Sequence, residues 1–169
     1  KKIVIKQYTV NDLYLIKKPT QEDKKAYGNA LGIIIKKAAS YKLGEGDTEI
    51  MQAFLKDKNP KTLTPFVTKR DHADALIASM LAMRVPVSAV PYHLLALNRA
   101  SEYRSMIDSF AGANNDPVRA TISFNGYMSN IKALIAALTN LSSYFESENI
   151  VFTKNEAGYL FTAGYTSNN

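Results

Sequence analysis

Lysine and arginine side chains are concentrated in the first 70 residues of this 169-residue chain, where fifteen of them accompany seven aspartates and glutamates. The rest of the chain carries six basic and eight acidic side chains, so the net charge of +6 arises in one region. A local positive field attracts polyanions, because each ammonium group that meets a phosphate releases a condensed counterion. The pattern therefore predicts a surface that binds nucleic acid, either DNA or RNA.

The candidate nucleic-acid-binding residues are nine basic side chains and one tyrosine: Lys17, Lys18, Lys24, Lys25, Lys36, Lys37, Lys42, Lys69, Arg70 and Tyr14. Tyr14 is included because an exposed aromatic ring among lysines can stack on an unpaired base, which is worth about 1–3 kcal/mol. Lysine outnumbers arginine, and lysine attracts phosphate as a point charge rather than reading base edges with a bidentate fork. We therefore expect weak sequence specificity. Two other interpretations stay open: the lysines meet an acidic protein surface, or they only keep the molecule soluble.

Asp71 and Asp74 form a second group that could do chemistry. They are three residues apart at the start of an expected helix and project from one side of it, where carboxylates can hold Mg²⁺. The pattern Asp-x-x-Asp-Ala-Leu at residues 71–76 is similar to the last acidic motif of RuvC-like nucleases, members of the RNase H-like superfamily. The resemblance implies a Mg-dependent nuclease fragment, since such enzymes cut nucleic acid with two metal ions held by about four carboxylates. The opening segment Ile3-Val4-Ile5 lacks the acid that the family carries in its first strand.

A structural role competes with the nuclease interpretation and is favoured here, because acids in the first turn of a helix stabilise its dipole. Neither His72 nor His93 has a second histidine at ligand spacing. The chain has no cysteine, which excludes disulfides, thiolate zinc sites and cysteine nucleophiles. It also lacks a Gly-x-Ser-x-Gly nucleophile elbow and a P-loop. We therefore predict no catalytic residue, no metal site and no cofactor, and a binding protein rather than an enzyme.

The same features indicate the compartment. The lack of cysteine fits a reducing cytoplasm. The longest weakly charged stretch, residues 75–98, contains Arg84 and is interrupted by Pro86 and Pro91, so it is not expected to span a membrane. We expect a soluble, cytoplasmic protein that makes no membrane contact.

The periodicity of apolar residues predicts about five helices, over residues 21–41, 48–56, 69–84, 88–110 and 129–146. Thr20 is a typical N-cap for the first of them. On this helix Tyr27, Leu31 and Ile34 are expected to face the core. Three small residues are expected to line a seam where another backbone could approach closely: Gly28, Gly32 and Ala39.

Short alternating segments predict strands near both ends of the chain. Residues 3–5 and 13–16 are expected to pair as a hairpin about a turn at Asn11-Asp12, and residues 150–153 and 159–162 as a closing hairpin. Residues 118–124 also alternate like a strand. The prediction is an α+β fold: a mainly helical single domain, residues 1–169, with a small antiparallel sheet from the two hairpins and a possible sub-boundary near residues 112–117.

The run from Ala133 to Phe145 contains no charged residue. An exposed helix normally carries Lys or Glu on its outer side, so both sides of this run are expected to be covered. Burial inside the monomer is one explanation, and contact with a second subunit is the other. The second explanation supports an alternative function, a self-assembling structural or interaction protein with uncharged helices at its interface.

Overall fold

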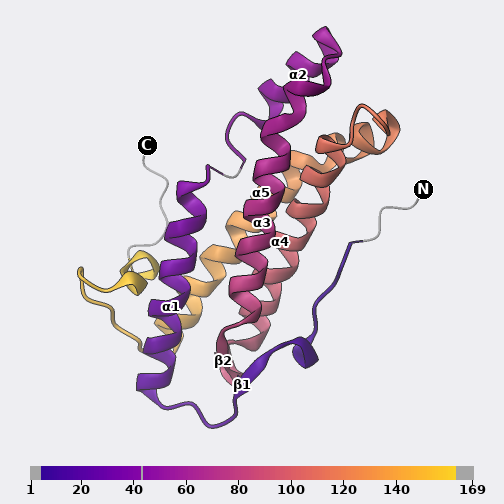
Figure 1. Cartoon of the computed structure of the whole chain (residues 1–169). Coiled ribbons are helices and arrows are strands. Elements are labelled where there is room, and N and C mark those ends of the chain that lie inside the picture. The colour runs from indigo at the N-terminus through magenta and orange to yellow at the C-terminus, as the bar shows by residue number, and fades with distance from the viewer. Residues whose placement is uncertain (1–4, 43, 163–169) are drawn as a thin grey trace.

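The computed structural model describes residues 5–42 and 44–162, and within these ranges the chain forms five helices and a two-stranded sheet (Figure 1). The helices are α1 (Gln21–Ser40), α2 (Asp47–Asp57), α3 (Thr64–Leu81), α4 (Val90–Ala111) and α5 (Pro117–Ser147). α4 packs along both α3 and α5, α1 packs against α3, and α2 stands at one end of the bundle. The mainly helical α+β prediction is confirmed.

The expected antiparallel sheet is wrong. β1 (Tyr14–Ile16) pairs in parallel with β2 (Arg84–Pro86), and Leu15 is in register with Val85. The residues before β1 form a 3-10 turn, Val10–Asp12, in place of a two-residue hairpin turn. The turn forms because the Asp12 carboxylate accepts from both the backbone N–H and the hydroxyl of Thr9, at 2.8 and 3.1 Å. Ile3 and Val4 of the expected first strand lie outside the described residues.

The other two expected strand regions are also wrong. Residues 118–124 belong to α5, which begins at Pro117 and is capped by the Asp116 side chain, an acceptor for Arg119 N at 3.0 Å. Proline in the first turn and an acidic cap start a helix here, and these signals outweigh the short alternation that follows. Residues 150–162 contain no strand, and a 3-10 turn, Ala157–Phe161, packs on α1 instead.

The start of α1 is as predicted. The Thr20 hydroxyl accepts from Asp23 N at 3.1 Å and the Asp23 carboxylate accepts from Thr20 N at 2.9 Å, which completes a capping box. The predicted seam is confirmed at Gly32, where a Cβ atom would collide with the carbonyl group of Ala157. This close approach lets the C-terminal segment lie directly on α1.

Gly32→Ala is therefore expected to lower the free energy of unfolding by about 2 kcal/mol, because the added methyl group meets backbone that cannot rotate away. Urea denaturation followed by circular dichroism measures the loss. Ala30→Gly, at an exposed position of the same helix, is the matched control and should cost only the helix propensity difference, about 1 kcal/mol. Equal stability of Gly32→Ala and the parent would contradict the close packing.

The core consists of two clusters of buried side chains. One joins α1, the C-terminal half of α3, the N-terminal half of α4 and the C-terminal half of α5. The other joins α2 to the remaining halves of α3, α4 and α5. On α1 the buried positions are Tyr27, Leu31 and Ile35, so Ile35 takes the place predicted for Ile34. Leu134 of α5 contacts both clusters, which places it at their junction.

Candidate functional site

Four of the candidate lysines form ion pairs within the chain, three of them near the surface. Lys24 Nζ is 2.5 Å from the Glu148 carboxylate, and Lys25 Nζ is 3.1 Å from that of Glu156. The pKa of Glu156 is lowered to about 2, by the hydrogen bond from Thr153 N and then by Lys25. Lys42 Nζ is 3.3 Å from the Glu45 carboxylate. These acids neutralise part of the expected positive field.

Lys69 and Arg70 are also engaged. Lys69 is buried on α3, where its ammonium donates to the Asp47 carboxylate and to the Glu45 carbonyl oxygen. Arg70 contacts Asp71 at 3.2 Å and Asp108 at 3.6 Å. Lys69 therefore lies in the interior rather than on the surface.

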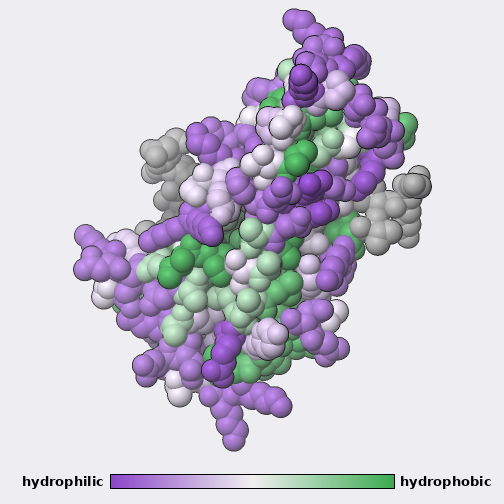
Figure 2. Space-filling model, in the orientation of Figure 1, coloured by the Kyte–Doolittle hydropathy of each residue, from purple (hydrophilic) through white to green (hydrophobic). Residues whose placement is uncertain are grey.

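Lys17, Lys18, Lys36 and Lys37 are exposed and form no ion pair with any residue in the described part of the chain. Tyr14 is exposed as well, at 67%. The two lysine pairs flank opposite ends of α1, which are about 22 Å apart at 1.5 Å per residue between Gln21 and Lys36. Figure 2 shows hydrophilic residues at both ends of this face and an apolar strip across its middle. The exposed lysines are thus two separate groups, farther apart than the screening length of about 8 Å at physiological salt.

Asp71 and Asp74 lie in the middle of α3, which begins at Thr64, so the expectation that they stabilise the dipole from its first turn is wrong. Both are held by arginines. Arg104 donates to both oxygens of Asp74, at 2.8 and 3.2 Å, and Arg70 pairs with Asp71. Within residues 5–42 and 44–162 no group of three or more His, Asp or Glu side chains could hold a metal ion. The additional carboxylates that a two-metal nuclease requires are thus not gathered around this pair.

Both histidines have contacts of a structural kind. His93 is fully buried, with Nδ1 3.0 Å from the Tyr27 hydroxyl and Nε2 3.2 Å from the Met80 carbonyl oxygen. Because a carbonyl oxygen only accepts, Nε2 carries the proton and Tyr27 donates to Nδ1. Burial lowers the pKa of His93 to about 4, so the ring is neutral. His72 stacks on Tyr41, with ring centroids 3.9 Å apart.

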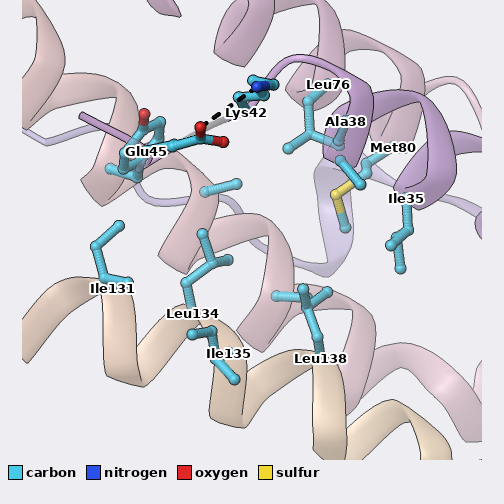
Figure 3. A pocket seen from close by; sticks show the side chains of 14 residues that line it. Ile35, Ala38, Lys42, Glu45, Leu76, Met80, Ile131, Leu134, Ile135 and Leu138 are labelled. Carbon is cyan, nitrogen blue, oxygen red and sulfur yellow. Dashed lines mark hydrogen bonds and ion pairs between the residues drawn. The ribbon is translucent and has the colours of Figure 1, made fainter. Parts of the chain in front are cut away.

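An apolar cavity of about 350 Å³ lies between α1, α3, α4 and α5. Its walls carry branched and long apolar side chains, labelled in Figure 3: Ile35, Leu76, Met80, Ile131, Leu134 and Leu138. It lies at the junction of the two core clusters. Four small side chains in its lining leave the space open: Ala38, Ala39, Ala96 and Ala100. Its lining includes the exposed residues Ala39 and Ile135, so it opens to solvent between α1 and α5.

Charged groups line only one end of this cavity. There Lys42 and Glu45, which follow the last turn of α1, form an ion pair (Figure 3). Behind the pair, the Tyr103 hydroxyl accepts from Gly44 N at 3.1 Å, and the Tyr127 hydroxyl lies 2.5 Å from the buried Asp47 carboxylate. Burial raises the pKa of both tyrosines, so both hydroxyls stay protonated. This polar cluster fixes the segment that carries Glu45.

No local pattern of the sequence predicted the cavity. The alanines that leave the space belong to two helices, α1 and α4, whose approach no local pattern reveals. The nearest signal was the set of small residues on α1, which predicted a seam for close backbone approach rather than an open space.

The uncharged run of α5 is covered on one side only. Ile135, Ala136, Thr139, Asn140 and Ser143 are exposed, so the expectation that the monomer buries both sides is wrong. Contact of this exposed side with a second subunit stays a prediction, which sedimentation velocity tests directly.

No protein-family model, curated protein or solved structure matches the chain. The helices in the described ranges also lack a segment with the length and hydropathy of a membrane span. What the molecule does must therefore be inferred from its own residues.

Proposed function

We propose that this chain is a binding protein that holds an apolar small molecule in the cavity between α1, α3, α4 and α5. The observation that carries the proposal is the cavity itself: about 350 Å³, apolar walls, an opening to solvent and charge at one end only. Small-molecule sites have volumes of roughly 300–1,000 Å³ and combine apolar walls with a few polar groups. The ten candidate nucleic-acid-binding residues do not form one free basic surface, because five of them form ion pairs within the chain.

The energetics of packing support occupancy. Protein interiors are close-packed, and atoms that line an empty space lose dispersion contacts. Ile35, Leu134 and Leu138 face this space and would regain such contacts with an apolar ligand. An apolar ligand in the cavity is thus stabilised by contacts with these walls, and the charged residues of its described lining, Lys42 and Glu45, lie at one end.

Binding of Nile red, a neutral apolar dye, tests the proposal by its fluorescence increase. Ala39→Phe places a ring in the cavity from an exposed position of α1 and is expected to weaken dye binding at least tenfold, about 1.4 kcal/mol. Ala26→Phe, exposed on the opposite side of α1, is the matched control and should bind like the parent. Equal binding by the two variants, or no saturable binding by the parent, would overturn the proposal.

Nucleic-acid binding is the second candidate function, supported by the exposed Lys17, Lys18, Lys36 and Lys37. Lys36→Gln combined with Lys37→Gln is expected to reduce the salt dependence of single-stranded DNA binding by a slope of about 1.4, because each lost phosphate contact removes about 0.7. Fluorescence anisotropy of a labelled oligonucleotide, titrated at several salt concentrations, measures this slope. An unchanged slope would remove the C-terminal end of α1 from the interface, and no binding at low salt would remove the function.

A further inference from the structure

We propose that the cavity takes a single alkyl chain with a carboxylate head, the chain lying between α1 and α5 and the head contacting Lys42. This inference rests on the proposed function and names its ligand class. It is based on where charge is located around the cavity and on the geometry of the two helices that form its long walls.

Charge lines one end of the cavity, as Lys42 and Glu45 (Figure 3). Their ion pair spans 3.3 Å, and the two side chains are 71% and 66% exposed. Ion pairs in solvent contribute little to stability, so another carboxylate can replace Glu45 at Lys42 at small cost. The opposite end, near Ile35 and Leu138, offers only apolar atoms. An occupant with one charged end and an apolar remainder fits this distribution.

Lysines near the opening favour a negatively charged head group on the ligand. Lys36 follows the lining residue Ile35 on α1, and Lys132 follows Ile131 on α5. Successive helical residues are about 100° apart, so both lysines turn from the lining towards solvent, where both are exposed. With Lys42, three lysines thus lie on or next to the two helices that border the opening, against one carboxylate among the lining residues, that of Glu45. This excess of positive charge favours an anionic head and disfavours a cationic one.

The walls also set the length of the chain. Ile131 and Leu138 are seven residues apart on α5, so this wall extends for about 10 Å, two helical turns. A chain lying along these walls buries its methylene groups one after another. Affinity is expected to rise about fourfold for each added methylene and to level off when the chain exceeds the cavity.

Calorimetric titration of the full chain with octanoate, decanoate and dodecanoate measures the length series. Decanol and decylammonium, which have the same chain as decanoate, isolate the head. We expect decanoate to bind about tenfold more tightly than decanol, because a hydrogen bond to a charged group is gained, and decylammonium to bind most weakly. Ala39→Phe should weaken the binding of decanoate, decanol and decylammonium alike.

Variants of Lys42 test whether this lysine contacts the carboxylate head of the ligand. Lys42→Met should bring the affinity for decanoate close to that for decanol while decanol binding stays unchanged, and Lys42→Arg should retain the preference. Lys56→Met, an exposed substitution on α2, is the control and should behave like the parent. Circular dichroism establishes that each variant is folded.

The outcomes separate this inference from the proposed function. If all three heads bind equally, and Ala39→Phe weakens them, the cavity binds apolar molecules and the carboxylate inference is wrong. If no alkyl chain binds while Nile red still binds and Ala39→Phe weakens that binding, only the further inference fails. If Nile red does not bind saturably either, both proposals fail. Vesicles of phosphatidylglycerol distinguish the sources of such a ligand: a protein that takes chains from a membrane sediments with them, whereas one that takes free fatty acids does not.

Discussion

Lys69→Met is expected to lower the free energy of unfolding by about 3–5 kcal/mol, the largest effect of any substitution considered for this chain. Lys69 and Asp47 form a buried ion pair, and the lysine also donates to the Glu45 carbonyl oxygen. Methionine has nearly the same volume but leaves the carboxylate of Asp47 charged and without its cation. The hydroxyl of Tyr127, 2.5 Å from that carboxylate, cannot neutralise it.

Urea denaturation at pH 7 measures the loss. Lys61→Met, an exposed substitution in the segment before α3, is the matched control and should change stability by less than about 0.5 kcal/mol. Adding Asp47→Asn to Lys69→Met should restore part of the stability, because the amide oxygen still accepts from Tyr127 while the unpaired charge is gone. A loss of less than about 1 kcal/mol for Lys69→Met would show that the pair is not buried in solution.

The burial of Lys69 is an example of what the sequence could not predict. The residue next to it, Arg70, reaches solvent, and both were assigned to one basic surface from their type alone. Burial of Lys69 depends on Asp47, 22 residues earlier, and pairing of Lys24 depends on Glu148, 124 residues later. Such partners meet only after the helices pack. The charge composition therefore shows the excess of lysine but does not predict which ammonium groups stay free of ion pairs within the chain.

Local signals were the reliable ones. The Thr20 cap and the break between Ala111 and Pro117 each depend on residues within one turn, and both are present as predicted. The strands failed because pairing is not local: β1 finds its partner at β2, about 70 residues further along, and in parallel. The cavity was missed for the same reason, since it results from the spacing of four helices rather than from a motif.

Lowering the pH from 6.5 to 4 is expected to remove about 3 kcal/mol of stability through His93 alone. Burial lowers the pKa of His93 to about 4 in the folded chain, against about 6.5 in an unfolded one. The unfolded state therefore binds a proton in this interval that the folded state does not. The contribution is complete above pH 6.5 and is lost as the pH falls towards 4, each pKa unit being worth about 1.4 kcal/mol.

The upper part of the interval separates His93 from the carboxylates. Asp12, Asp23, Asp57 and Glu156 have lowered pKa values and begin to lose their contributions only as the pH approaches their unfolded pKa values of about 4. Free energies of unfolding in urea, measured at half-unit steps from pH 7 to pH 4, give the slope. His93→Gln should flatten it, because the amide can still accept from Tyr27 and donate to Met80 but does not titrate. His72→Gln, which changes the only other histidine, should keep it. A slope that survives His93→Gln would mean that another group titrates in this interval. A parent protein without the slope would mean that the ring of His93 takes up its proton in the folded chain.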